Sequence, residues 1–487
     1  MNKLNLDMFY NPKSIAIYGA SNNPQRFGSL ILANILSGGF KGKVYPIHPK
    51  EKIIFGIQGY LSIGDVPETV DLVLMVLPTK LVLEKLEECG KAGVKGIIIV
   101  TAGFKEVGNE RPEEEMRKLS KKYEIKIIGP NCIGEVATNS HVNMTPMMVN
   151  PIPGNVSLIS QSGSYAAHVL LPIIQKIGLG ISKIISVGNE ACMDMVDFLE
   201  YLGEDDETKA IGLYIEGIKR GKKFIEVARK VSLKKPIVAI KIGQTKAGVR
   251  SAMSHTGSIA NNEDVIEAVF KQTGIIHVDT SIQMLNALKC FSDLSLPPGK
   301  NFVIQTVGGG PGTKLADLLE ANGVNIPLLS EPLQKELSYL LPPTASSKNP
   351  VDLTFDPIWD NFYFKIPKLL LSSSECDGLI IYGFWGTQMI DNFFERLPMN
   401  DQVETSKAQM LDFYLNMVNS YIKKMLRLSK KYNKPIIGSS VFFRDEEPFI
   451  KYCQDSGLPI FLLEEAADAV ISLVKYSEWK RKQNNLK

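Results

Sequence analysis

The sequence predicts an α/β protein made of parallel sheets with helices on both faces. Short apolar runs rich in β-branched residues alternate with longer stretches of helical periodicity along most of the chain, and this alternation is typical of such sheets. At 487 residues the chain is too long for one hydrophobic core, so about three domains are expected.

Composition argues against several classes of protein. With 55 basic and 52 acidic residues the net charge is only +3, and no clustered basic face indicates a nucleic-acid partner. No apolar run reaches membrane-spanning length, and the first ten residues lack the apolar core of a signal peptide. The six cysteines are scattered without a CxxC pair, so neither a disulfide framework nor a zinc cluster is expected. We therefore expect a cytoplasmic protein with no metal-binding residues, no nucleic-acid partner and no membrane partner.

The first third of the chain predicts a parallel sheet in a domain over residues 1–135. The expected strands are residues 14–18, 44–47, 73–77, 97–100 and 125–128. The expected helices are residues 27–36, 81–90 and 113–123.

Small and polar residues follow these strands, at the edge where parallel sheets bind ligands. They are Gly19, Ala20, Ser21, Asn22, Lys50, Pro78, Thr101 and Asn131. The first turn is not a GxGxxG fingerprint, because Gly19 is followed by Gly28 nine residues later, and no acid stands where a dinucleotide's ribose needs one. A dehydrogenase is therefore disfavoured. Lys50 would suit a phosphate-bearing ligand, and an exposed loop lysine is the alternative.

A second series of strands predicts a domain of flavodoxin-like size over residues 150–295. The expected strands are residues 156–160, 184–189, 211–216 and 237–240. The first of them runs into a serine- and glycine-rich turn that precedes a helix, and such a turn offers N–H groups and the positive end of the helix dipole to phosphate. The candidate phosphate ligands are Ser160, Ser162, Gly163 and Ser164. Ordinary N-capping by serine is the alternative.

Two more residues indicate chemistry at the same edge. His255 lies in Ser254-His255-Thr256-Gly257-Ser258, where small neighbours leave the imidazole uncrowded, and histidine can act as a neutral nucleophile near pH 7. Glu216 ends a strand one βα unit earlier, and its carboxylate would accept the imidazole N–H. The structural alternatives are a loop histidine bonded to its hydroxyl neighbours and an acid that caps a helix. Convergence of turn, acid and histidine on one rim favours the functional interpretation.

The last third predicts another parallel α/β domain, over residues 300–487. The expected strands lie near residues 302–305, 349–353, 379–381, 435–437 and 459–461. A glycine-rich turn at residues 306–312 is either a phosphate site or a tight turn, and both stay open. Helical periodicity from Met410 onward predicts a helix whose apolar stripe packs in the core, with a partner surface as the alternative.

Five short motifs allow a comparison with known families. They are Gly19-Ala20-Ser21, Gly129-Pro130-Asn131-Cys132, Ser160-Gln161-Ser162-Gly163, Val187-Gly188-Asn189 and Ser254-His255-Thr256-Gly257. In this order they resemble the ADP-forming acyl-CoA synthetases (acetate–CoA ligases), relatives of the succinyl-CoA synthetase α subunit. The resemblance covers nearly the whole chain, with departures at Cys192, Asn261 and Val307. It implies a Rossmann-like CoA-binding domain followed by two flavodoxin-like domains.

The resemblance also implies roles for the candidate residues. The strand-end residues of the first domain, from Gly19 to Asn131, would bind coenzyme A. His255 would carry phosphate between an acyl phosphate and ADP, Glu216 would orient it, and the Ser160–Ser164 turn would hold its phosphate. The enzyme would interconvert an acyl-CoA, ADP and phosphate with a small carboxylic acid, CoA and ATP.

No P-loop and no ATP-grasp domain is recognisable in the sequence. ADP or ATP with Mg²⁺ would therefore be bound mainly by a separate ATP-grasp β subunit, in an α2β2 assembly. Two other functions stay open. One is an ATP-independent acyl or carbamoyl transferase on the same scaffold, and the other is a non-catalytic CoA-binding regulatory protein.

Overall fold

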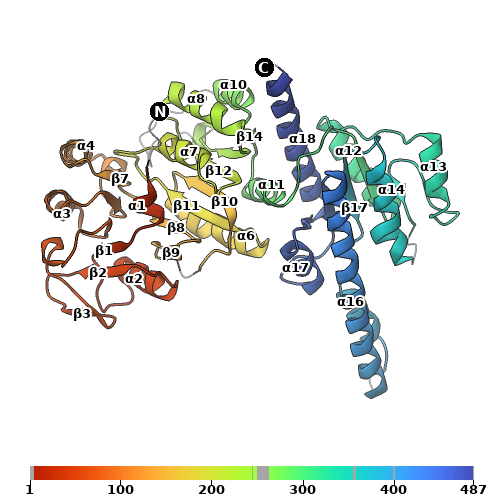
Figure 1. Ribbon diagram of the computed structural model, residues 1–487, viewed down its shortest axis with the longest axis horizontal. Helices are drawn as coiled ribbons and strands as arrows, with labels where there is room; N and C mark the ends of the chain where they lie inside the picture. Colours follow the sequence, from red (N-terminus) through yellow and green to blue (C-terminus); the bar gives the residue numbers. More distant parts are fainter. Residues whose placement is uncertain are drawn as a thin grey trace. The chain divides into compact units, whose positions relative to one another are not determined.

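Three large sheets, two of them wholly parallel, organise the described part of the chain (Figure 1). The α/β class expected from the sequence is therefore confirmed. The computed structural model describes residues 5–147, 149–243, 245–248, 250, 263–354, 358–398 and 401–485. The chain divides into two units, residues 1–175 with 179–284, which hold two of the sheets, and residues 176–178 with 285–487, which hold the third.

The first sheet has the order β2-β1-β5-β6-β7 and is parallel throughout. Its strands are β1 (Ser14–Tyr18), β2 (Lys43–Ile47), β5 (Leu72–Met75), β6 (Gly96–Ile99) and β7 (Lys126–Ile128). The helices between them are α2 (Phe27–Ser37), α3 (Thr79–Lys91) and α4 (Arg111–Tyr123). These elements follow the predicted ones closely. A short hairpin, β3 (Ile53–Ile54) and β4 (Ile57–Gln58), was not predicted.

The two faces of the first sheet pack into different cores. Ile15 and the α2 residue Ile31 belong to a core that continues into the second sheet. Ala16, on the opposite face, packs with Val82 of α3 in a separate core, because successive strand residues point to opposite sides. The shared core joins the first two sheets into one unit.

The second sheet has the order β14-β13-β12-β10-β11-β8-β9. Its parallel strands are β10 (Pro153–Ser160), β11 (Ile181–Ser186), β12 (Ala210–Ile215), β13 (Ile237–Lys241) and β14 (Ile276–His277). Two short strands at its edge, β8 (Glu135–Ala137) and β9 (Val142–Asn143), run antiparallel to their neighbours. The chain therefore enters this sheet at Glu135, earlier than the sequence pattern indicated.

Helices on both faces of the second sheet position its loops. One continuous helical segment begins two residues after β10. It consists of α5 (Gly163–Tyr165), a π-helical turn η3 (Ala166–Leu170) and α6 (Leu171–Lys176). The others are α7 (Met195–Gly203), α8 (Gly221–Ser232) and α10 (Glu263–Thr273). Single π turns inside helices recur at functional sites.

The third sheet, in the other unit, has the order β16-β15-β17-β18-β19 and is parallel. Its strands are β15 (Phe302–Thr306), β16 (Val351–Asp352), β17 (Gly378–Tyr382), β18 (Ile436–Ser439) and β19 (Ile460–Phe461). The glycine-rich turn opens helix α12 (Gly309–Ala321). Helices α14 (Ile366–Ser372), α15 (Gln388–Phe394), α16 (Asp401–Tyr432), α17 (Pro448–Asp455) and α18 (Leu463–Asn485) complete this unit with α13 (Glu331–Ser338).

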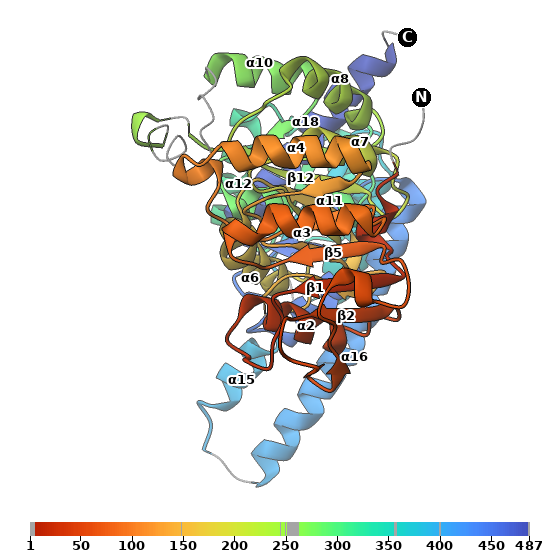
Figure 2. The same cartoon turned by 90° about the vertical axis from the view of Figure 1, so that its left-hand side faces the viewer.

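The long helix α16 begins at Asp401, nine residues before the predicted start at Met410. Its later turns bury Tyr414 and Val418 in the core of this unit, which confirms that this part of the apolar stripe packs inward. Its first turns are exposed and lie beside α15 (Figure 2), to which Lys407 is tied by an ion pair with Asp391. The start was missed because exposed turns carry no apolar stripe.

No helix within the described ranges is both long and apolar enough to cross a bilayer. The six cysteines are all free thiols, and five of them are buried.

Candidate active site

A cavity of about 530 Å³, here called the central cavity, opens where the carboxyl ends of the first two sheets meet. Residues predicted from both sheets line it together. They are Pro78, Thr101, Asn131, Ser162, Gly163, Ser164 and Glu216. This placement follows from the parallel topology, which brings strand ends to one edge of each sheet.

The Ser162–Ser164 turn begins the helical segment after β10. Ser162 is its N-cap, with a hydroxyl that accepts the N–H of Tyr165 at 3.2 Å. Ser162 therefore makes the N-cap contact that was the structural alternative, and it also lines the cavity. Ser160 is placed differently, because it is fully buried and its hydroxyl donates to the Ser162 carbonyl at 2.7 Å. Ser160 therefore stabilises the turn through this hydrogen bond and does not line the cavity.

Glu216 follows β12 and is 8% exposed. Its backbone N–H donates to the side-chain oxygen of Gln161 at 2.5 Å, and its carbonyl accepts from the ammonium group of Lys241 at 2.9 Å. Burial lowers the pKa of Lys241, and the nearby negative charge of Glu216 opposes that shift. Both sides of the Glu216 peptide are thus held by buried side chains.

A second cavity, of about 460 Å³, lies on another side of the same turn. Ser162, Ser164 and Glu216 line it together with His168 of η3. The turn and the carboxylate can therefore be reached from two cavities.

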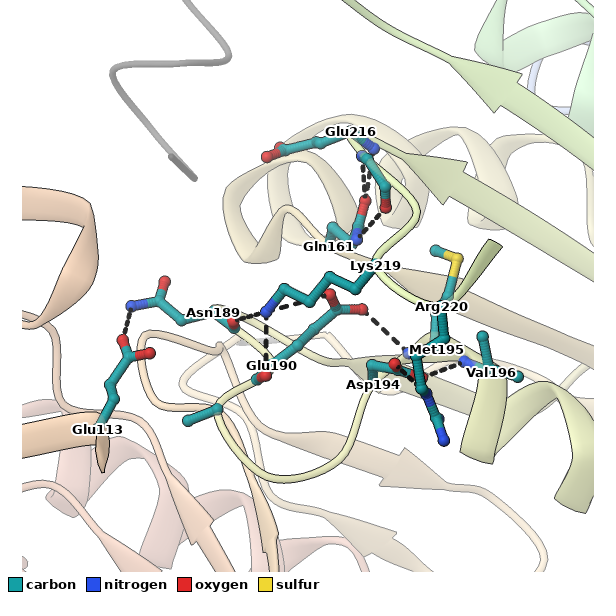
Figure 3. Close-up of polar contacts among 12 residues, drawn as sticks. Glu113, Gln161, Asn189, Glu190, Asp194, Met195, Val196, Glu216, Lys219 and Arg220 are labelled. Carbon is teal, nitrogen blue, oxygen red and sulfur yellow. Dashed lines mark hydrogen bonds and ion pairs between the residues drawn. The ribbon is translucent and has the colours of Figure 1, made fainter. Parts of the chain in front are cut away.

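The loop after β11 joins the two sheets at the central cavity (Figure 3). The Asn189 side-chain amide donates to Glu106 at 2.5 Å and to Glu113 at 2.8 Å, both from the first sheet's side. Its side-chain oxygen accepts from Asn131 at 3.2 Å. The Lys219 ammonium group donates to the Asn189 carbonyl at 2.6 Å. These contacts tie the two predicted ligand-binding edges together.

Glu190, next in this loop, has a backbone φ of 55° and is buried. Non-glycine residues in this left-handed region carry backbone strain and cluster at functional sites. Its carboxylate accepts the N–H of Met195 at 2.9 Å and lies 3.6 Å from the Lys219 ammonium group. Burial raises the pKa of Glu190 to about 7, and Lys219 opposes the shift.

Replacing Glu190 by glutamine is expected to remove a pH-dependent loss of stability. A carboxyl group whose folded pKa is raised contributes stability below its unfolded pKa of 4.5 and loses it as pH rises through about 7. Above that range the Glu190→Gln protein should gain roughly 3 kcal/mol in free energy of unfolding relative to the parent. Denaturant titrations between pH 4.5 and 8 measure this difference.

The partly exposed Glu115, whose pKa is lowered by a hydrogen bond from Lys118, is the control. Glu115→Gln should change stability little, and in the opposite direction. A parent and Glu190→Gln pair with parallel pH profiles would contradict the prediction.

A third cavity, of about 480 Å³ and here called the outer cavity, lies over the first sheet. Gly19 lines it, with three cationic or titratable side chains that the sequence analysis did not select, Arg26, His48 and Lys85. Lys85 is on α3, and helical spacing alone does not show which face of a helix a ligand meets. His48 is two residues before the predicted Lys50, and this position after the second strand was the signal that could have identified it.

The other predicted residues of the first turn lie outside all three cavities. Ala20 and Ser21 are buried, and the Ser21 N–H donates to the Ser29 hydroxyl at 3.0 Å. The Asn22 side chain donates to Glu51 at 2.7 Å, and Lys50 is on an exposed loop.

The predicted nucleophile His255 lies outside the described residues, as does the whole Ser254–Ala260 stretch. In the residues that are described, no group of three or more His, Cys, Asp and Glu side chains is arranged to hold a metal ion.

Two family descriptions match the first unit. Residues 13–137 match the CoA binding domain, and residues 153–291 match the succinyl-CoA ligase like flavodoxin domain. The acetate–CoA ligase [ADP-forming] of Methanocaldococcus jannaschii is 42% identical over 345 residues, which cover 71% of this chain and 48% of that protein.

Two relatives from Pyrococcus furiosus carry subunit names. The acetate–CoA ligase [ADP-forming] I subunit alpha is 34% identical over 487 residues, covering 98% of this chain and 99% of that protein. The II subunit alpha is 44% identical over 377 residues, covering 77% and 81%. Among solved structures, acetyl-coenzyme A synthetase 1 of Ca. Korarchaeum cryptofilum, in complex with phosphate and ADP, matches with a TM-score of 0.87 and 33% identity over 99% of both chains. The chain therefore belongs to the family of ADP-forming acetate–CoA ligases, among the relatives named as α subunits.

Proposed function

We propose that this chain is the α subunit of an ADP-forming acyl-CoA synthetase. It would convert an acyl-CoA, ADP and phosphate into a carboxylic acid, CoA and ATP, and the reverse. The observation that carries the proposal is the central cavity, where a serine-glycine helix start and a buried glutamate face the ligand-binding edge of a CoA-type domain. An acyl thioester, a phosphate and a histidine partner need these three features side by side.

Coenzyme A would occupy the central and outer cavities. The central and outer cavities share the residues Phe27, Val76, Leu77 and Pro78, so one extended ligand can follow the wall between them. In the outer cavity, apolar side chains would hold the adenine, and Arg26 and Lys85 would pair with phosphate groups. We assign CoA binding to the domain over residues 1–135, with the thiol end in the central cavity.

The proposed reaction needs a phosphate next to the thioester and a nitrogen nucleophile that can reach the phosphorus of the acyl phosphate. A phosphate oxygen attacks the thioester carbonyl, the C–S bond breaks, and CoA leaves as the thiol. The imidazole of His255 then attacks the phosphorus of the acyl phosphate and releases the carboxylate. Glu216 would accept the other imidazole N–H and balance the charge that develops. The N–H groups of Gly163 and Ser164, at the positive end of the helical segment, would hold the phosphate.

The nucleotide step is assigned to a partner. ADP or ATP with Mg²⁺ would be bound mainly by an ATP-grasp β subunit in a cytoplasmic α2β2 enzyme. The subunit names of the P. furiosus relatives support a partner.

Phosphopeptide mapping tests this function. The holoenzyme is incubated with acetyl-CoA and radiolabelled inorganic phosphate without ADP, digested and mapped under conditions that preserve phosphohistidine. Label on His255 that is released by ADP supports the proposal. Turnover without any phosphoprotein would instead support the ATP-independent transferase, and CoA binding without turnover would support the regulatory protein.

Replacing Gly28 by alanine is expected to weaken CoA binding. A Cβ at this position in the first turn of α2 would lie 2.5 Å from the Gly19 carbonyl oxygen, so the loop and the helix must separate. We expect about tenfold or greater loss of acetyl-CoA affinity and a stability loss of roughly 1–3 kcal/mol. Isothermal titration and thermal unfolding measure the two effects. Gly221→Ala, whose Cβ meets open space, is the control and should change neither.

A further inference from the structure

We infer that Gln161 is a positioning residue that sets the direction of the Glu216 side chain. The inference rests on the proposed function, in which Glu216 is the partner of the phosphorylated histidine. Gln161 belongs to the Ser160–Ser164 turn, and the inferred role differs from the phosphate binding proposed for the other residues of this turn.

The side-chain amide of Gln161 binds the backbone of two consecutive residues, Glu216 and Gly217. Its oxygen accepts the N–H of Glu216 at 2.5 Å and the N–H of Gly217 at 3.0 Å. Its NH₂ group donates to the Gly217 carbonyl at 2.8 Å. One amide therefore fixes two consecutive residues at the end of β12, as a neighbouring strand would (Figure 3).

The backbone of Gln161 is itself held at the adjoining position. Its N–H donates to the Tyr214 carbonyl at 3.3 Å, which continues the β10–β12 pairing one residue beyond the strand. Gln161 is 9% exposed and lines the central cavity. Gln161 is therefore held at its backbone and at its side chain, which also hydrogen-bonds the carboxylate of Glu190 and so opposes the rise in the pKa of that group.

This geometry matters because the carboxylate has to meet an imidazole in one direction. Glu216 is the first residue after the last strand hydrogen bond, where backbone torsions would otherwise be free to vary. Lys241 contacts the carbonyl of Glu216, whereas Gln161 contacts the N–H of Glu216 and both backbone polar groups of Gly217, so loss of Gln161 removes three hydrogen bonds from this segment. A displacement of about 1 Å at such a site can cost on the order of 100-fold in rate.

A double-mutant cycle tests the inference. Phosphohistidine formation from acetyl-CoA and labelled phosphate is timed in the holoenzyme for the parent, Gln161→Met, Glu216→Ala and the double variant. We expect Gln161→Met to lower the rate by about 10- to 100-fold with a change in KM for acetyl-CoA below about twofold. In the Glu216→Ala background the same substitution should cost less than about twofold, because its effect acts through the missing carboxylate.

The outcomes distinguish a failure of the role proposed for Glu216 from a failure of the role inferred for Gln161. Glu216→Ala at the parent rate would overturn the role of Glu216, and with it this inference. If Glu216→Ala is slow but Gln161→Met reacts at the parent rate, the inference about Gln161 alone is overturned. Equal losses from Gln161→Met in both backgrounds would overturn it as well, since that is the result of a general structural role.

Stability is controlled with a glutamine of similar burial elsewhere. Gln454 on α17 donates its side-chain NH₂ to the Ile460 carbonyl at 2.7 Å and is 5% exposed. Gln454→Met should lose stability without slowing phosphorylation. If Gln161→Met does not fold, Gln161→Asn replaces it in the cycle, because an amide one methylene shorter cannot reach both peptides, and the same rate pattern is expected.

Discussion

Replacing His255 with alanine is expected to abolish phosphoryl transfer, with at least about a 1,000-fold loss in the overall reaction. The covalent route divides one difficult transfer into two easier ones, and His255→Ala removes the proposed carrier of the phosphoryl group. The measurement is phosphoprotein formation and ATP synthesis by the holoenzyme supplied with acetyl-CoA, phosphate and ADP. Binding of CoA to the first domain should remain.

His141→Asn is the control for this substitution. His141 is exposed and has a φ of 56°, a conformation that asparagine tolerates better than alanine. This variant should keep the full rate. Label that persists in His255→Ala would contradict the assignment, and His168, beside Ser162 and Glu216 in the second cavity, would then be the residue to map.

Replacing Glu216 with glutamine is expected to slow phosphohistidine formation by about 100-fold. The change keeps the shape and the contacts of the peptide with Gln161 and Lys241. It removes the negative charge that would stabilise an imidazole as it becomes cationic or phosphorylated. Single-turnover labelling with acetyl-CoA and phosphate measures the rate, and acetyl-CoA affinity should stay near that of the parent.

Glu226→Gln is the matched control, since this carboxylate is on α8 and forms an exposed ion pair with Lys223 at 3.1 Å. It should leave the rate unchanged. A Glu216→Gln protein that labels at the parent rate would show that the carboxylate has no part in the transfer.

The sequence was a good guide to elements whose signal is local. Continuous apolar runs predicted the buried parallel strands, and β1 was predicted to the residue. The edge strands β8 and β9 were missed because Glu135–Ala137 and Val142–Asn143 are not continuous apolar runs. They exist through pairing with β11 and with each other, which a local pattern does not show.

The residues of the candidate site also divide into those with a local signal in the sequence and those without one. Glu216 and Ser162 were found because each ends a strand or begins a helix, and their meeting in one cavity follows from the topology. Arg26 precedes α2 and Lys85 is on α3. Neither was found, because a cation in a loop or on a helix is usually solvated and only the neighbouring segments make a cavity around it. Lys50 was selected by the same rule of strand ends and lies on an exposed loop.

The sequence by itself determined the parallel α/β class, the family resemblance and the residues at strand ends, because these depend on patterns within one segment. The tertiary structure alone decided which segments line the same cavity. It set Asn189 against Glu106 and Glu113, and it placed the Gln161 amide across the Glu216 peptide. Such contacts join residues 55 to 83 positions apart in the chain, and they form only when strand pairing within a sheet, or the packing of one sheet against another, brings loops within hydrogen-bonding distance.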